Sequence, residues 1–148
     1  MVSTTGLSVR IYQCDKTTKA WTLAAEINTP GAGPITAADF DNDGYLDFLI
    51  TGNPDGGTRN LISQIWHNNG TGTFSNVTAS VASTLPGVYG SAAAWADYDN
   101  DGHLDFLLIG DAVSRRVAQL WRNNGNGTFS DVTTLAAPGL IGVYQGSV

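Results

Sequence analysis

Eight of the thirteen acidic residues of this 148-residue chain lie in two short runs, Asp39 to Asp47 and Asp97 to Asp105. Both runs read Asp-x-Asp-x-Asp-Gly-x-x-Asp. Calcium takes about six to eight oxygen ligands at about 2.3–2.6 Å, and carboxylates at alternate positions of a curled loop supply such oxygens. Clustered carboxylates repel one another unless a cation lies between them. The pattern therefore predicts calcium as the cofactor, with two ions per chain and one in each run.

Each position within a run has its own expected role. Positions 1, 3, 5 and 9 offer side-chain carboxylates, position 7 offers its backbone carbonyl, and the glycine at position 6 permits a sharp turn. A donor set made only of oxygens favours calcium over zinc. A helical EF-hand is excluded, because its loop needs a glutamate where this chain has Ile50 and Leu108. The predicted metal ligands are Asp39, Asp41, Asp43, Tyr45 and Asp47 in the first run, and Asp97, Asp99, Asp101, His103 and Asp105 in the second.

The two histidines and the lone cysteine do not predict catalysis. His67 and His103 lack partners at a spacing typical of a hydrolytic triad. We expect His67 to lie at the surface or to be partly packed, and the side chain of His103 to be an exposed bystander. Cys14 is the only cysteine, so no intrachain disulfide can form, and no histidine motif marks it as a nucleophile. The chain is therefore expected not to be an enzyme.

The charge of the chain is concentrated in the aspartate runs. The net charge is −6, yet the rest of the chain holds five acidic and seven basic residues. No basic stripe is present, which argues against a nucleic-acid partner. The sequence contains no run of about 18 apolar residues, so membrane insertion is not expected, and its first residues do not read as a signal peptide.

An internal repeat predicts the fold class. The run at 39–47 recurs 58 residues later, and the stretch 65–78 recurs 55 residues later at 120–133. Each unit reads as four strands joined by turns rich in asparagine and glycine. Four strands in a repeat of this size are typical of a propeller blade, so we expect an all-β fold of four-stranded antiparallel β-propeller blades. The predicted strands are 35–40, 45–51, 61–67 and 73–77 in the first unit, and 91–98, 103–109, 117–122 and 128–132 in the second.

The ends of the chain read as parts of further blades. Residues 7–12 resemble a third strand, and the C-terminal residues echo the approach to a first strand. We therefore expect residues 1–148 to be a single propeller segment. It divides into a partial blade at 7–30, blades at 34–80 and 90–135, and the start of another blade at 143–148.

The tryptophans and the Asn-x-Thr triplets have structural readings. Trp66 and Trp121 occupy equivalent repeat positions, which predicts packing between blades, whereas Trp95 replaces Ala37 and is expected to be more exposed. Asn-x-Thr triplets such as 76–78 and 126–128 fit the glycosylation acceptor pattern but are also ordinary turn chemistry.

These motifs together resemble the FG-GAP/VCBS repeats. An Asp-x-Asp-x-Asp-Gly-x-x-Asp run lies between two strands and is followed by Trp-x-Asn-Asn-Gly-x-Gly-Thr-Phe, as in Trp121 to Phe129. The resemblance covers the chain from about Leu7 to Val148. It implies a calcium-binding propeller like those of integrin α-subunits and many secreted bacterial proteins, with one calcium between the first two strands of a blade. The chain departs from the family in having too few blades to close a ring and no Phe-Gly…Gly-Ala-Pro string.

Function is expected to follow from the resemblance. The first hypothesis is a non-catalytic scaffold for adhesion or recognition, located outside the cell or at its surface, that binds a protein or glycan ligand. The alternatives are a calcium-dependent carbohydrate-binding module and a purely structural unit that self-assembles. Because the sequence holds too few blades for a closed ring, a homo-oligomer that completes the propeller is a further possible partner arrangement.

Overall fold

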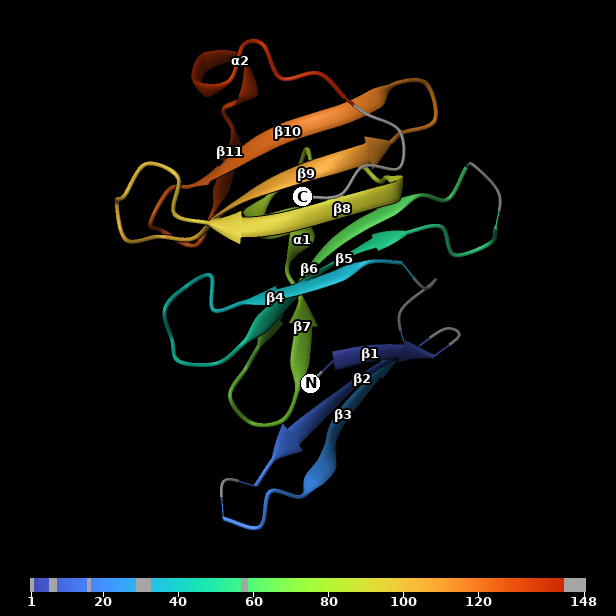
Figure 1. Ribbon diagram of the computed structural model, residues 1–148, viewed down its shortest axis with the longest axis vertical. Coiled ribbons are helices and arrows are strands. Elements are labelled where there is room, and N and C mark those ends of the chain that lie inside the picture. The colour runs from blue at the N-terminus through green and yellow to red at the C-terminus, as the bar shows by residue number, and fades with distance from the viewer. Residues whose placement is uncertain (1, 6–7, 16, 29–32, 57–58, 143–148) are drawn as a thin grey trace.

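Three antiparallel sheets follow one another along the long axis of the molecule (Figure 1). The structure is a computed structural model that describes residues 2–5, 8–15, 17–28, 33–56 and 59–142. The predicted start of a further blade at 143–148 lies outside the described residues. The all-β class is confirmed, because every sheet is antiparallel and the only helices in the described ranges are two four-residue ones.

The middle and C-terminal sheets have the same plan of four consecutive strands, and the N-terminal sheet has three. The N-terminal sheet comprises β1 Val2–Thr5, β2 Ser8–Cys14 and β3 Trp21–Asn28. The middle sheet comprises β4 Ile35–Ala38, β5 Asp47–Gly52, β6 Ile62–Asn68 and β7 Phe74–Asn76. The C-terminal sheet comprises β8 Tyr89–Ala96, β9 Asp105–Asp111, β10 Arg116–Asn123 and β11 Phe129–Asp131.

All eight strands predicted for the two repeat units are present, with shifted ends. A short helix follows each fourth strand and was not predicted: α1 Thr78–Val81 and α2 Thr133–Ala136. The Asn76 carboxamide accepts the backbone N–H of Thr78 at 3.1 Å, and the Asp131 carboxylate accepts that of Thr133 at 3.0 Å. Because aspartate makes the same contact in the second unit, this triplet has a structural role in the turn.

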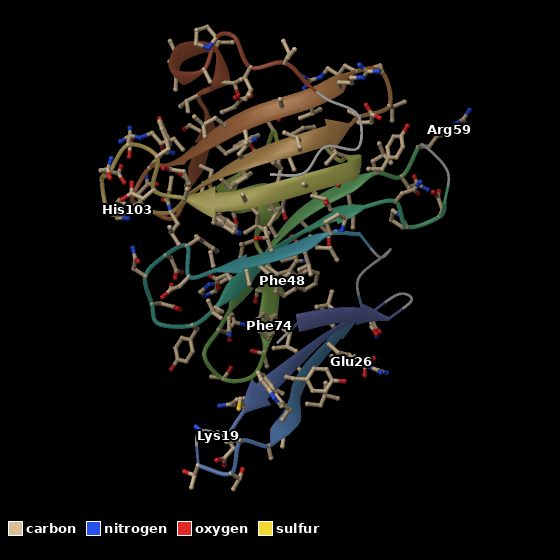
Figure 2. All side chains as sticks on the ribbon, in the orientation of Figure 1. Lys19, Glu26, Phe48, Arg59, Phe74 and His103 are labelled. Atoms are coloured by element: carbon tan, nitrogen blue, oxygen red, sulfur yellow. The ribbon has the colours of Figure 1, made fainter. Side chains whose placement is uncertain are left out.

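The main core lies between the middle and C-terminal sheets. Phe40, Leu49 and Ile65 of the middle sheet and its first loop pack against a face of the C-terminal sheet. A smaller core around Val9, Phe48 and Ile50 joins the N-terminal and middle sheets, and Figure 2 shows Phe48 and Phe74 on that side. The residues contributed by the C-terminal sheet are Phe106, Leu108, Val117, Trp121 and Phe129.

The repeat tryptophans lie between neighbouring sheets, Trp121 in the main core and Trp66 against the smaller one. Trp66 stacks on Phe48 with ring centroids 6.0 Å apart, and Trp121 stacks on Phe106 at 5.8 Å. In both sheets the two rings belong to directly paired residues of the second and third strands. The stacked pair is therefore a repeated feature of the blade-like unit.

Trp95, which was expected to be more exposed than Trp66 and Trp121, is partly buried and packs against the main core. Its ring stacks on Phe40 at 6.5 Å and meets Phe106 edge-on at 5.1 Å. The reason is that β8 lies beside β4 and β5, so the middle sheet covers this face of the strand. Trp21 is the exposed one, with 52% of its surface accessible.

None of the helices in the described part of the chain is long and apolar enough to cross a membrane.

Candidate metal centre

The two aspartate runs form equivalent loops at the same end of their sheets (Figure 1). Loop 1, residues 39–47, leads from β4 into β5, and loop 2, residues 97–105, leads from β8 into β9. The loops contact each other, because the Asn42 side chain donates a hydrogen bond to the Gly102 carbonyl at 3.3 Å.

The first aspartate of each loop shapes the backbone. Asp39 accepts the backbone N–H groups of Asp43 at 3.0 Å and Gly44 at 2.9 Å. Asp97 makes the equivalent two bonds, each at 3.0 Å, to Asp101 and Gly102. The glycines at position 6 have φ of 91° and 88°, in the left-handed region that favours glycine. This agreement shows that both runs adopt one conformation.

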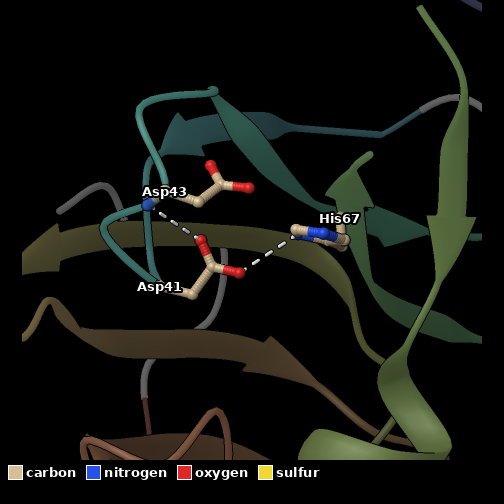
Figure 3. A group of neighbouring side chains, drawn as sticks. All are labelled: Asp41, Asp43 and His67. Carbon is tan, nitrogen blue, oxygen red and sulfur yellow. Dashed lines mark hydrogen bonds and ion pairs between the residues drawn. The ribbon is translucent and has the colours of Figure 1, made fainter. Parts of the chain in front are cut away.

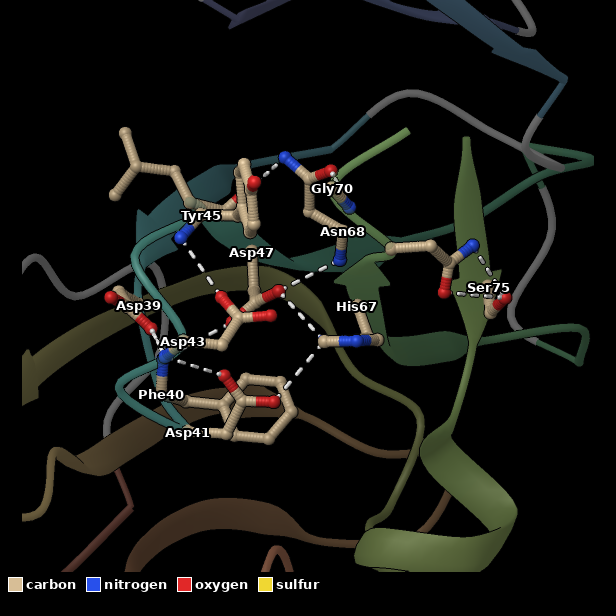
Figure 4. Close-up of polar contacts among 12 residues, drawn as sticks. Asp39, Phe40, Asp41, Asp43, Tyr45, Asp47, His67, Asn68, Gly70 and Ser75 are labelled. Carbon is tan, nitrogen blue, oxygen red and sulfur yellow. Dashed lines mark hydrogen bonds and ion pairs between the residues drawn. The ribbon is translucent and has the colours of Figure 1, made fainter. Parts of the chain in front are cut away.

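The last aspartate of each loop is buried and anchors two backbone segments. Asp47 is 0% exposed, and its two oxygens accept the N–H groups of Phe40 at 3.1 Å and Asn68 at 2.8 Å (Figure 4). Burial raises the pKa of Asp47 to about 6, although these hydrogen bonds act in the opposite direction. Asp105 accepts the N–H groups of Tyr98 at 3.0 Å and Asn123 at 2.7 Å, and burial raises its pKa as well.

The structure brings most of the predicted carboxylates together. Oxygens of Asp39, Asp41 and Asp47 all lie within 4.8 Å of one another. Oxygens that share a calcium ion can be no more than about 5.2 Å apart, twice the usual ligand distance. The spacing therefore fits a single calcium ion bound through hard oxygen donors. In loop 2 the close group is Asp97, Asp99 and Asp101, which lie at positions 1, 3 and 5 of the run instead of 1, 3 and 9.

Two predicted carboxylates stand apart from these groups. Asp43 is grouped instead with Asp41 and the imidazole of His67, as Figure 3 shows. Asp105 belongs to none of the close groups found among the described residues. The ligand role of each residue stays a prediction.

The position-7 side chains pack on the turn between the third and fourth strands. A Cβ on Gly70 would lie 2.6 Å from the Tyr45 ring, and one on Gly125 would lie 2.7 Å from the His103 imidazole. His103 was expected to be an exposed bystander, but this contact leaves it partly buried. The side chains of Tyr45 and His103 therefore face the neighbouring glycine turns. This packing is compatible with a ligand role for their backbone carbonyls alone.

Two residues near the loops were not predicted to belong to the site. His67 Nδ1 lies 3.3 Å from Asp41 and 3.2 Å from Asp47 (Figure 4). Arg122 lies 2.7 Å from Asp99 through Nε and 2.9 Å from Asp101 through Nη2. Hydrogen bonding to Asp99 is the largest cause that raises the pKa of Arg122. The signal available in the sequence was that His67 and Arg122 occupy equivalent repeat positions.

This combination of repeated antiparallel four-stranded sheets and aspartate loops defines a β-rich repeat protein. Residues 39–108 match the family model of the FG-GAP-like repeat, a segment that contains both loops. This match confirms the resemblance drawn from the motifs over residues 39–108, just under half of the chain. No curated protein matches the chain.

Proposed function

We propose that this chain is a non-catalytic, calcium-binding segment of a β-propeller. The observation that carries the proposal is the grouping of three carboxylates within 4.8 Å in each of two loops of the same backbone conformation. The calcium ion would neutralise this negative charge and hold together the ends of the first two strands. Asp39, Asp41, Asp43 and Asp47 would hold one ion, and Asp97, Asp99, Asp101 and Asp105 the other, with carbonyls from Tyr45 and His103.

A calcium titration tests the metal site. Isothermal titration of the metal-free protein should detect two ions per chain. Asp43→Ala and Asp101→Ala should each remove one, while Asp55→Asn should remove none because Asp55 lies outside both loops. Metal analysis that finds no bound calcium after dialysis against calcium would contradict the proposal.

The blade arrangement is supported by how the sheets stack. Leu49, Ile65 and Phe40 form the face of the middle sheet that is covered by the C-terminal sheet. The equivalent residues of the C-terminal sheet are Leu107, Leu120 and Tyr98, which line an open apolar depression of about 280 Å³. We assign this face to a further copy of the repeat unit, which would cover it as the C-terminal sheet covers the middle one. Stacking of this kind continues a propeller.

A scaffold role is favoured over catalysis. A cavity of about 480 Å³ beside β6 and α1 is lined by residues such as Ser63, Gln64 and Asn76, with no titratable side chain among them. The charged groups gather instead at the loops, where they hold one another and the backbone. A hydrolase screen with purified protein should detect no turnover. Activity that survives purification and is lost in His67→Ala or His103→Ala would overturn this part of the proposal.

We further propose an adhesion or recognition role outside the cell or at its surface, by analogy with the repeat family. Extracellular calcium modules bind in the range of about 10⁻⁴–10⁻³ M, so measured affinities in this range would support the location. The carbohydrate-binding alternative is favoured by one observation, the 52% exposure of Trp21. Glycan-dependent quenching of tryptophan fluorescence that is lost in Trp21→Ala would support it.

A further inference from the structure

Loops 1 and 2 share their aspartates but differ in the residue that the third strand directs at them. His67 near the end of β6 and Arg122 near the end of β10 are related by the 55-residue offset of the repeat. Both contact carboxylates of the loop in their own sheet. Equivalent positions thus place side chains of different charge against otherwise matching loops.

Arg122 partly neutralises loop 2. Its guanidinium spans the carboxylates at positions 3 and 5, with contacts of 2.7 Å to Asp99 and 2.9 Å to Asp101. Guanidinium is positively charged at any accessible pH, and its fork of N–H donors fits carboxylate oxygens. Both carboxylates belong to the group of three whose oxygens lie close enough for one ion. The Arg122 guanidinium therefore already occupies two carboxylates, Asp99 and Asp101, that a divalent cation would need as ligands.

His67 acts on loop 1 in a different way. Its Nδ1 contacts the carboxylates at positions 3 and 9, Asp41 and Asp47. An imidazole carries no permanent charge and can present a lone pair as well as an N–H. No arginine or lysine forms an ion pair with loop 1 among the described residues. Loop 1 therefore keeps more of its negative charge than loop 2.

We propose that Arg122 lowers the affinity of loop 2 for divalent cations, so that loop 1 is the stronger calcium site and loop 2 the weaker. This inference rests on the proposed calcium binding. An ion entering loop 2 must take Asp99 and Asp101 from the guanidinium or bind beside its charge. Because Arg122 is 42% exposed and solvent screens such pairs, the expected difference in affinity is on the order of tenfold.

Exchange of the two residues tests the inference. Calcium is titrated calorimetrically into the metal-free full chain at low ionic strength, for wild type and four variants. Arg122→His should tighten the weaker site about tenfold, and His67→Arg should weaken the stronger one. Arg116→His, at the other end of the same strand and exposed, should leave both affinities unchanged. Asp43→Ala should remove the stronger site, which assigns that site to loop 1.

The outcomes separate this inference from the proposed function. A wild type with two equal sites that Arg122→His leaves unaltered overturns the inference and leaves calcium binding intact. A wild type with one ion, and a second ion only in Arg122→His, supports the inference. A lack of calcium binding in every variant overturns both. Circular dichroism verifies folding, and Arg122→Gln replaces Arg122→His if the latter does not fold.

Discussion

At the scale of single residues, the aspartates of each loop differ in the backbone groups that they bind. Within the described residues, Asp39 and Asp97 accept hydrogen bonds only from the backbone of their own loop. Asp47 and Asp105 also bond to the third strand, through Asn68 and Asn123. Position 9 is therefore a link between strands as well as a predicted ligand, and its substitution should affect the metal-free fold.

The unfolding free energy of the metal-free protein should depend on pH because Asp47 titrates. Its folded-state pKa of about 6 lies above the ordinary value of 3.8. Between pH 3.8 and about 6 the folded protein therefore binds more protons than the unfolded protein does. Its contribution to the unfolding free energy is therefore greatest below about pH 4 and falls as the pH rises to about 6. The full change would be at most about 3 kcal/mol.

Asp47→Asn isolates this contribution, because asparagine does not titrate. The unfolding free energy of the variant relative to wild type should rise between pH 4 and 7, measured by urea denaturation of metal-free protein. The N–H groups of Phe40 and Asn68 each bond to a separate oxygen of Asp47, and asparagine has only one such oxygen. The lost hydrogen bond destabilises the variant by about 1–3 kcal/mol at all pH values. A difference that is independent of pH would mean that Asp47 does not titrate in this range.

At the scale of elements, the turn between the third and fourth strands packs against the aspartate loop of the same sheet. Gly125 has φ of 71°, and a Cβ there would also strike His103. Gly127 in the same turn has φ of 78°, but a Cβ there would meet nothing within 4 Å. Both glycines thus have a positive φ, but only at Gly125 would a Cβ strike another side chain.

Gly125→Ala should therefore destabilise the protein more than Gly127→Ala. Backbone strain of about 1 kcal/mol or more is common to both variants, and displacement of His103 adds to it only in Gly125→Ala. Chemical denaturation measures both unfolding free energies. Equal losses would show that His103 moves aside without cost.

The two sheets are connected by a buried asparagine. Asn123 is 2% exposed and donates to the Phe40 carbonyl in loop 1 at 2.7 Å and to the Leu104 carbonyl in loop 2 at 3.2 Å. Its repeat equivalent, Asn68, donates to Leu46 within its own sheet at 3.2 Å. The bond to Phe40 is thus an addition specific to the boundary between two sheets.

Asn123→Ala should cost more stability than Asn68→Ala. Both lose the local bonds that hold the glycine turn, but only the first leaves the buried Phe40 carbonyl without this donor. The excess should be about 1–3 kcal/mol by urea denaturation. If Asn68→Ala is equally costly, the bond between the sheets adds nothing to the local ones.

At the scale of the whole molecule, calcium should stabilise the fold. A ligand that binds only the folded state adds about 2.7 kcal/mol per site at 100 times its dissociation constant. The melting temperature should therefore rise with calcium and fall on chelation, by calorimetry or fluorescence. Magnesium at the same ionic strength is the control, because it demands stricter octahedral geometry and sheds water reluctantly. Melting that is insensitive to chelation would contradict a structural role for the metal.

The open face of the C-terminal sheet should drive self-association. Leu107, Leu120 and Tyr98 are apolar and line a shallow depression, and Tyr98 is 39% exposed. The N-terminal sheet carries an ion pair between Arg10 and Glu26 at 3.1 Å but also exposes Trp21 and Leu23, at 52% and 51%. The apolar depression on the C-terminal sheet is therefore an expected contact surface.

Light scattering with calcium should detect a discrete oligomer that Leu107→Asp converts to monomer. Leu135→Asp is the matched control, because Leu135 is 86% exposed and lies in α2. A monodisperse wild-type monomer would exclude ring closure by self-assembly and leave the open face to a repeat unit outside these 148 residues.

The sequence by itself determined the repeat, its strands and the shape of the aspartate loops. These features are local: Asp39 reaches only as far as Gly44, and glycine is needed where φ is positive. The alternation of apolar and polar residues likewise defines strands over a few positions, and turn-forming residues define the hairpins between them. Such short-range constraints can be read directly from residue order.

Only the tertiary structure decided what surrounds the loops. Pairing of Phe48 with Trp66 sets the register that brings His67 to Asp47, and the same register in the C-terminal sheet brings Arg122 to its loop. The stacking of whole sheets partly buries Trp95. These neighbours come from strand register and sheet packing between residues far apart in sequence, which no local pattern specifies.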